Sequence, residues 1–255
     1  MALRFAFLGS GSRGNALLVE TPGARVLVDC GFTASETESR LKCLQVDPQT
    51  LSGILVTHEH GDHIRGVGVL ARRYGIPVWM TPGTAGGADY GVLPDLRMID
   101  CHAGYWLLED LRVQPYPVPH DAREPCQFLL SHGGGCLGVL TDTGHVTPHI
   151  VETLQVCDGL VLEFNHDRQM LATGPYPKSL QVRVGGHHGH LSNDQALQLL
   201  SQLPVTRLCH LVASHISEKN NSPQRVKSLL AQHQPDLATR CQLAEQGGVS
   251  AWFDL

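Results

Sequence analysis

The feature that most constrains this chain is a group of histidines directly behind a short apolar run. Residues 53–57 are mostly apolar and lead straight into His58-Glu59-His60-Gly61-Asp62-His63. Alternate residues of an extended segment share a face, so His58 and His60 can bind one cation. Asp62 and His63 then face a second position. The segment predicts a metal site behind a buried strand, and a histidine-rich surface turn is the alternative.

Histidine is also frequent in the chain as a whole, at 15 of 255 residues. It is the commonest metal ligand in proteins and the usual proton carrier near neutral pH. Side chains suited to metals or protons recur at or just after the ends of apolar runs: Asp29, His58, His120, Asp142, Glu163 and His215. Because ligands of layered α/β folds collect beyond strand ends, we expect one site assembled from these distant segments.

Strand and helix patterns alternate along both halves of the chain. We expect strands at residues 4–8, 15–20, 25–29, 53–57, 77–80, 128–131, 137–141, 159–163 and 207–214. We expect helices at residues 33–44, 64–74, 192–203 and 222–233. No linker or short-period repeat interrupts this order. The chain is therefore predicted to be one α/β domain over residues 1–255, made of two similar halves with a boundary near residue 125.

Composition excludes several classes. Lys plus Arg is 19 and Asp plus Glu is 24, which gives a net charge of −5 and excludes a generally basic nucleic-acid-binding protein, although not a local basic groove. No apolar run reaches the roughly 18 residues needed to cross a bilayer, and the first residues resemble a strand rather than a signal peptide. The eight cysteines are scattered without a CxxC motif. We expect a cytoplasmic protein with no membrane partner.

Thr57-His58-Glu59-His60-Gly61-Asp62-His63 resembles the signature of the metallo-β-lactamase-fold hydrolases, and further motifs match in order along the chain. These motifs are Asp29, Pro119-His120-Asp121, Thr141-Asp142-Thr143-Gly144 and Ser214-His215-Ile216-Ser217. The resemblance implies a four-layer αββα sandwich of the metallo-β-lactamase type. The chain lacks the long insert of the β-CASP nucleases. Taken singly, Asp29 and Asp142 also suit turns, His120 an exposed loop, and His215 a helix cap.

The resemblance also implies two divalent metal ions, zinc or manganese, about 3.5–4 Å apart with a bridging hydroxide as nucleophile. It assigns the first ion to His58, His60 and His120. It assigns the second to Asp62, His63 and His215, with Asp142 shared. Asp62 is expected to be catalytic as well as a ligand, and Asp29 is expected to support the ligand loop.

A second pair of motifs, Glu163-Phe164-Asn165 and Gly189-His190-Leu191-Ser192-Asn193, is similar to motifs of the ribonuclease Z-like and phosphodiesterase branches. The similarity implies that His190 protonates the leaving oxygen and that Glu163 orients it. A carboxylate that holds one ring nitrogen raises the basicity of the other, which suits this role. The alternative for His190 is a loop residue beside a helix cap at Ser192.

The finest resemblance is to the YycJ/WalJ-like group, described as 5′-to-3′ DNA exonucleases linked to mismatch repair. It is carried by residues 9–15, Asn165-His166-Asp167, Gly174-Pro175-Tyr176-Pro177, residues 189–193 and His215-Ile216-Ser217 with Asn220-Asn221. Arg13 and Ile216 depart from the group's usual residues. The expected function is a dinuclear-metal phosphodiesterase on nucleic acid, with DNA as the expected partner. The sequence does not identify a protein partner.

Substrate contacts are predicted at six polar residues: Ser10, Ser12, Asn15, His166, Asn220 and Asn221. Backbone N–H groups of the Gly/Ser loop could cradle phosphate, and a tight strand connection is the alternative. The asparagines could equally form a turn. Five basic side chains near the motifs either line a phosphate channel or belong to a mixed surface: Arg13, Arg65, Lys178, Arg183 and Lys219.

The fold alone does not name the substrate, so alternatives stay open. A small or cyclic-nucleotide phosphodiesterase is slightly favoured by the net charge of −5. An RNA-processing nuclease shares the same chemistry. A thiolester or lactam hydrolase has no need of a proton-donating histidine, so Glu163 and His190 count against it. A non-catalytic metal-binding domain has no need of seven intact ligands.

Overall fold

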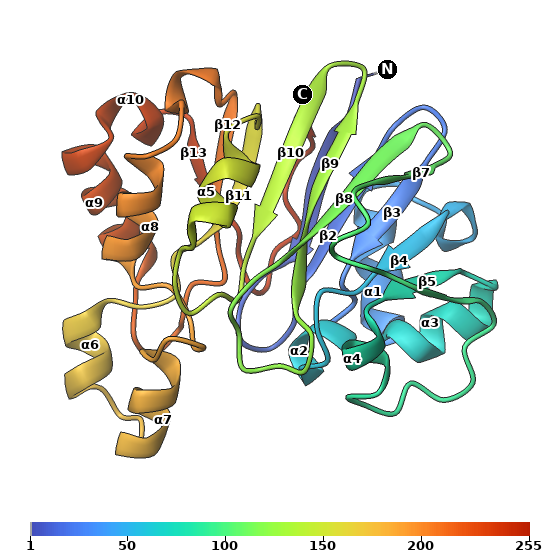
Figure 1. Cartoon of the computed structure of the whole chain (residues 1–255), viewed down its shortest axis with the longest axis horizontal. Coiled ribbons are helices and arrows are strands. Elements are labelled where there is room, and N and C mark those ends of the chain that lie inside the picture. Colours follow the sequence, from blue (N-terminus) through green and yellow to red (C-terminus); the bar gives the residue numbers. More distant parts are fainter. Residues whose placement is uncertain (1) are drawn as a thin grey trace.

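The computed structural model describes residues 2–255, which form two sheets packed face to face between layers of helices (Figure 1). The strands of the first sheet, in spatial order, are β14 (Phe253–Asp254), β1 (Arg4–Gly9), β2 (Ala16–Glu20), β3 (Arg25–Val28), β4 (Gly53–Leu55), β5 (Val78–Met80) and β6 (Leu96–Met98). Those of the second are β13 (Cys241–Leu243), β12 (His210–Ser214), β11 (Gly159–Glu163), β10 (Gly135–Leu140), β9 (Cys126–His132), β8 (Leu111–Pro117) and β7 (Trp106–Leu108).

Helices cover the outer face of each sheet (Figure 1). Those of the first half are α1 (Ala34–Cys43), α2 (Gly61–Ile64), α3 (Val67–Tyr74) and α4 (Pro82–Ala85). The helices of the second half are α5 (Pro148–Leu154), α6 (Arg168–Thr173), α7 (Lys178–Val184), α8 (Asn193–Leu200), α9 (Pro223–His233) and α10 (Pro235–Ala238), of which α6 and α7 do not cover a sheet. The predicted αββα sandwich is confirmed. None of the helices between residues 2 and 255 is long and apolar enough to cross a membrane.

Three apolar clusters hold these layers together. In β11, Val161 points into the cluster between the sheets, whereas Leu160 and Leu162 point into the cluster under α5, α8 and α9. In the first sheet, Leu18 and Leu27 pack against Leu41 of α1 and its neighbours. Strands buried on both faces need unbroken apolar runs, which is why their sequences show little alternation.

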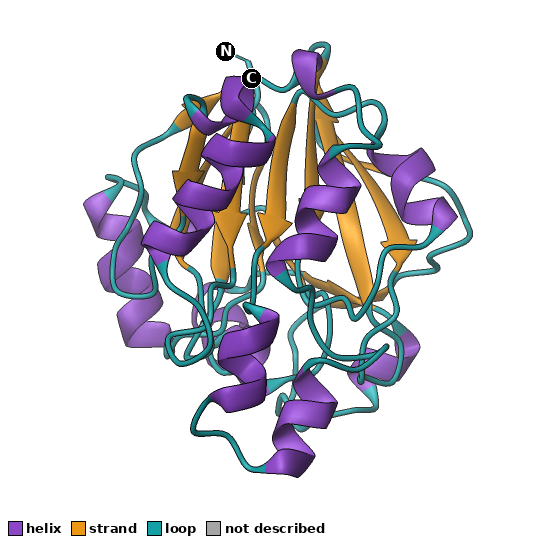
Figure 2. Cartoon of the chain, turned by 90° about the vertical axis from the view of Figure 1, so that its left-hand side faces the viewer, coloured by secondary structure: helices purple, strands orange, loops and turns teal. Residues whose placement is uncertain are grey.

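The central strands of both sheets are parallel, and their carboxyl ends carry the polar residues singled out above. β3, β4 and β5 pair in parallel in the first sheet, as do β10, β11 and β12 in the second. Helices α6 and α7 lie beyond the strands, at the end of the molecule away from the two chain termini (Figures 1 and 2). The chain passes from the first sheet to the second between Met98 and Trp106, earlier than the boundary expected near residue 125.

The predicted helix over residues 64–74 is wrong at its start, because the structure breaks it at Gly66. The Gly66 N–H donates to the Cys30 carbonyl at 2.8 Å rather than to its own helix. A Cβ at Gly66 would lie 2.4 Å from the Phe32 carbonyl oxygen, so only glycine permits this contact. The strand expected from residue 207 begins at His210, after a 3₁₀ turn at Val205–Arg207.

Candidate active site

The candidate site lies where strands of both sheets end. Asp29 follows β3, Asp142 follows β10 by two residues, and His215 follows β12 directly. All three adopt left-handed φ angles, of 62°, 48° and 51°. Such a conformation costs a non-glycine residue about 1–3 kcal/mol and persists only where the surroundings enforce it. The backbone is therefore turned sharply at three strand ends, and each turn carries a predicted site residue.

The first group of potential ligands is His58, His60 and His120. His58 Nε2 lies 3.0 Å from His60 Nδ1, and His120 Nε2 lies 3.2 Å from the same atom. The Nδ1 atoms of His58 and His120, on the other side of each ring, contact protein oxygens. His58 Nδ1 lies 3.0 Å from Thr57 Oγ1, and His120 Nδ1 donates to the Gly189 carbonyl at 2.9 Å. Three ring nitrogens consequently converge on one point.

The second group is Asp62, His63 and His215, one carboxylate and two rings that together satisfy the spacing of a metal site. His63 Nε2 lies 3.6 Å and His215 Nε2 3.5 Å from Asp62 Oδ2. Asp29 supports this group: its Oδ2 accepts from His63 Nδ1 at 2.8 Å, and its carboxylate also accepts from Thr57 N and Oγ1. The Asp29 contacts fix the histidine loop against β4.

Asp142 lies between the two groups. It belongs to a cluster with His58 and His63 and to another with Glu163, His190 and His215. Its buried Oδ2 lies 3.3 Å from His63 Nε2 but makes no hydrogen bond within residues 2–255, and the buried His215 Nε2 likewise has no hydrogen-bond partner there. Leaving a buried polar atom unpaired costs roughly 1–3 kcal/mol. The donor set and these two unpartnered atoms fit divalent cations in both positions.

Electrostatics divides the histidines into two types. Burial lowers the pKa of His58 well below its usual value and also lowers that of His120, so both rings are neutral and offer a lone pair. Burial likewise opposes charge on His63, yet Asp142, Asp29 and Asp62 outweigh it and hold its pKa well above the usual value. The carboxylates similarly raise the pKa of the buried His215 to about 10. Cation binding at these rings must release protons.

Glu163 is fully buried and surrounded by donors. Its Oε1 lies 2.8 Å from His190 Nδ1 and 3.0 Å from His215 Nδ1. Its Oε2 accepts from Leu191 N at 3.0 Å and Thr143 N at 3.3 Å. Burial raises the pKa of Glu163, but the nearby His190 and the hydrogen bonds have the larger, opposite effect and lower the pKa to about 2. One charged carboxylate therefore orients both histidines.

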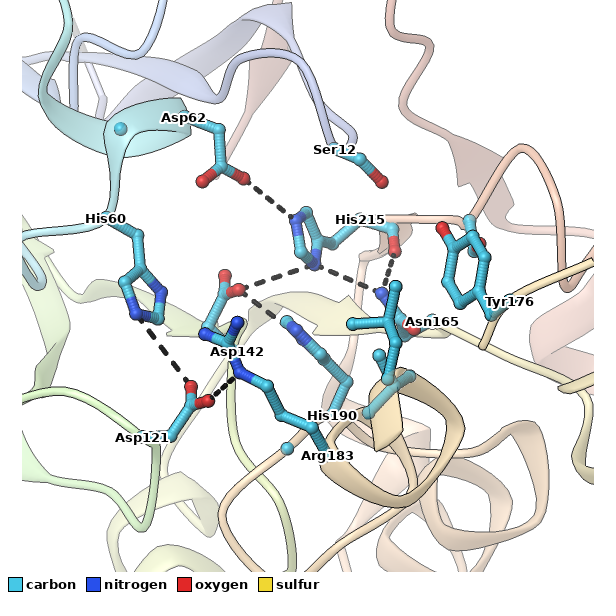
Figure 3. Close-up of a pocket in the computed structure, with 15 residues that line it drawn as sticks. Ser12, His60, Asp62, Asp121, Asp142, Asn165, Tyr176, Arg183, His190 and His215 are labelled. Atoms are coloured by element: carbon cyan, nitrogen blue, oxygen red, sulfur yellow. Dashed lines mark hydrogen bonds and ion pairs between the residues drawn. The ribbon is translucent and has the colours of Figure 1, made fainter. Parts of the chain in front are cut away.

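A cavity of about 410 Å³ opens over these groups (Figure 3). Of the predicted metal-binding and catalytic residues, five line it: His60, Asp62, Asp142, His190 and His215. His58, His63, His120 and Glu163 are buried behind them. His190 is half-buried, and the pKa of its ring is raised because Glu163 outweighs the effect of burial.

Of the six predicted substrate contacts, only Ser12 lines this cavity. Ser10 Oγ donates to Asn15 Oδ1 at 3.0 Å and accepts from His215 N at 2.9 Å. Ser10 and Asn15 therefore hold the backbone of His215 in place instead of facing the cavity. Asn15 Nδ2 also lies 3.3 Å from Asp62 Oδ2. Asn220 and Asn221 are buried away from the cavity; Asn221 donates to the Phe164 carbonyl and pairs with a neighbouring asparagine.

His166 lies on a separate groove of about 540 Å³ that Lys178 also lines. Of the five basic side chains named from the sequence, only Arg183 lines the cavity. Arg13 instead forms an ion pair with Glu218 at 2.7 Å.

Sequence reasoning did not single out three further residues of the cavity: Asp121, Asn165 and Tyr176. Each stands inside a motif that the sequence analysis quotes. Asp121 follows the ligand-type residue His120 directly and reaches two histidines: its Oδ1 lies 3.4 Å from His120 Nε2 and 3.8 Å from His60 Nε2. A carboxylate next to a predicted ligand was the available signal.

Comparisons with known proteins agree with this fold. A family model described as "Beta-lactamase superfamily domain" matches residues 24–216. The chain is 34% identical over 235 residues to a protein named exodeoxyribonuclease YycJ from Bacillus anthracis, which covers 91% of this chain and 89% of the relative. It is 31% identical over 228 residues to one named exodeoxyribonuclease WalJ from Streptococcus pneumoniae, covering 87% of this chain and 84% of the relative.

Among solved structures, the metallo-beta-lactamase fold protein YhfI from Bacillus subtilis matches 98% of this chain and 100% of its own, with a TM-score of 0.75. The sequence identity of this pair is 12%, so the likeness concerns the fold alone.

Proposed function

Because this chain belongs to the beta-lactamase superfamily, we propose that it is a metal-dependent phosphodiesterase acting on nucleic acid. The finer proposal is a 5′-to-3′ exonuclease of DNA that serves mismatch repair in the cytoplasm. Two relatives named exodeoxyribonucleases, similar over 89% and 84% of their own lengths, support exonuclease action on DNA.

One observation carries the choice of reaction. His190, held through Nδ1 by the buried Glu163, lines the same cavity as Asp62 and Asp142. Cleavage of an unactivated phosphodiester leaves an alkoxide, which needs a proton. A histidine with a raised pKa beside the metal-ligand residues supplies that proton, and hydrolysis of a lactam has less need of it.

The proposal assigns different roles to the residues of the site. His58, His60 and His120 would hold one divalent ion. Asp62, His63 and His215 would hold the other, with Asp142 shared between them. Zinc or manganese in these positions would supply an activated nucleophile and neutralise charge on the phosphate. Glu163 keeps a proton on His190 Nδ1, and the other ring nitrogen of His190 delivers a proton to the departing 3′ oxygen.

Substitutions separate these roles. We expect Asp142→Ala and His60→Ala to lose both bound metal and activity. His190→Ala should keep its metal but lose about 10²–10⁴-fold in rate on an unactivated phosphodiester. Wild-type turnover by this variant would refute the role of His190.

A small-molecule phosphodiesterase is the second candidate. The net charge of −5 and the single arginine that lines the cavity favour a short substrate over a long polyanion. The deciding experiment incubates the metal-loaded protein with 5′-labelled double-stranded DNA, single-stranded DNA, RNA and bis(p-nitrophenyl) phosphate. Stepwise loss of nucleotides from DNA supports the exonuclease. Turnover of the small ester alone would replace it by the second candidate.

A further inference from the structure

The cavity is lined by several carboxylates but by a single permanently charged cation. Its lining includes the carboxylates of Asp62, Asp121 and Asp142, whereas Arg183 is the only lysine or arginine among the described residues that line it. Glu163 adds a further buried carboxylate behind them. A phosphodiester that enters this cavity is itself an anion, so it needs positive charge beyond the ligand positions. Arg183 is the one permanently charged side chain that can provide it.

Arg183 stands in the last turn of α7 and extends over the cavity (Figure 3). Its Nε donates to Asp121 Oδ2. Within residues 2–255, this is the one hydrogen-bonded or ion-paired contact of the guanidinium, so both terminal amino groups stay free. Arginine presents several donors in a rigid fork, and a partner at Nε leaves the other edge free to bind two oxygens of a phosphate.

The backbone ties Arg183 to His190. His190 N–H donates to the Val184 carbonyl at 2.8 Å, which joins the end of α7 to the histidine loop. A Cβ at Gly189 would lie 2.2 Å from the carbonyl oxygens of both Arg183 and Val184, so this approach is possible because residue 189 is glycine. These backbone contacts thus hold the end of α7, which carries Arg183, against the loop that carries His190.

We propose that Arg183 binds the phosphate of the substrate through its two terminal amino groups, with Asp121 as the positioning residue that holds the guanidinium over the cavity. This inference rests on the proposed function, since it assigns a phosphate contact within the same site. If Arg183 binds phosphate in this way, the substrates of this cavity are anionic esters. The same arrangement also gives Asp121 a task that its neighbour His120, a candidate ligand, does not share.

The first test compares Arg183→Gln with Lys178→Gln. Lys178 is an exposed cation at the start of the same helix and lines the separate groove rather than the cavity. With bis(p-nitrophenyl) phosphate, Arg183→Gln should lower kcat/KM about 10- to 100-fold, mainly through a higher KM, because a hydrogen-bonded charge pair is lost. Arg183→Lys should recover part of this loss. Lys178→Gln should stay within about twofold of wild type, and all variants should bind the same amount of metal.

Binding of inorganic phosphate, measured by calorimetry on the metal-loaded proteins, tests Arg183 without turnover. Wild type should bind phosphate at least about tenfold more tightly than Arg183→Gln. Equal binding, no binding to wild type, or a loss confined to kcat with an unchanged KM would overturn the inference. A wild type that cleaves no phosphodiester but binds phosphate through Arg183 would instead refute the proposed function alone.

Discussion

Replacing Glu163 by glutamine tests the core of the site with a change of one charge and almost no volume. Four donors surround this carboxylate: the Nδ1 atoms of His190 and His215, and the backbone N–H groups of Leu191 and Thr143. A glutamine must turn its own NH₂ group toward one pair of them. Either the two histidines or the two backbone groups then lose their acceptor.

The structure gives the size of this effect. Two buried donors left unpaired, at roughly 1–3 kcal/mol each, lower the free energy of unfolding by about 2–6 kcal/mol. If the amide faces the rings, His215 can no longer keep a proton on Nδ1, and a neutral ring then carries its proton on Nε2, the atom that faces Asp62 and that a cation would need. His190 loses its charged partner in the same way. We therefore expect weaker metal binding and a fall in rate of about 10²–10⁴-fold.

The assay is denaturant unfolding of Glu163→Gln and wild type in chelator at pH 7, followed by metal content and turnover after reloading. Glu152→Gln is the matched control, since Glu152 is exposed on α5. The control should stay within about 0.5 kcal/mol of wild type. A Glu163→Gln protein with wild-type stability and wild-type turnover would refute the reasoning.

Two further predictions concern the support of the site and the stability of the first sheet. In Gly31→Ala, the new Cβ would lie 1.7 Å from the Asp62 carbonyl oxygen, so the ligand loop must shift; the variant should lose bound metal by elemental analysis, whereas Gly247→Ala, with open space at its Cβ, should not. Burial raises the pKa of Glu20, but Arg25 and Arg4 outweigh it and hold the pKa below 4.5. Glu20→Gln should therefore be about 2 kcal/mol less stable than wild type above pH 4.5, and the difference should vanish as the pH falls through the lowered folded-state pKa. A difference that persists at low pH in denaturant titrations would exclude this ion pair as its source.

The sequence predicted most of the buried strands because their residues are apolar on both faces, whereas the four-layer arrangement was implied by the family resemblance. The sequence patterns missed α7, none of whose residues is buried, and β6, whose residues are all exposed. Segments without a buried face show no apolar period, so no pattern could reveal them. The break at Gly66 depends on contacts with Cys30 and Phe32, which lie more than thirty positions earlier in the chain.

The residues of the candidate site could likewise be predicted only where a buried strand locates them. Side chains at the ends of buried strands, such as Asp29, Asp142 and His215, could be named because the strand pattern locates them. Arg183 and Tyr176 could not be assigned to the cavity in advance, because α7 and the segment before it carry no such pattern. Asn221 was expected at the substrate, and the structure instead surrounds it with buried protein partners. Distant packing of this kind is not visible in local sequence.

The measurement that tests the central claim most directly is a metal titration of chelator-treated protein, with cleavage of 5′-labelled single-stranded DNA as the readout. Zinc and manganese are added separately to wild type and to Asp142→Ala. The proposed site predicts no cleavage without metal, activity that rises to a maximum at two equivalents per chain, and no recovery in Asp142→Ala. Full cleavage in chelator, or equal recovery by Asp142→Ala, would contradict it.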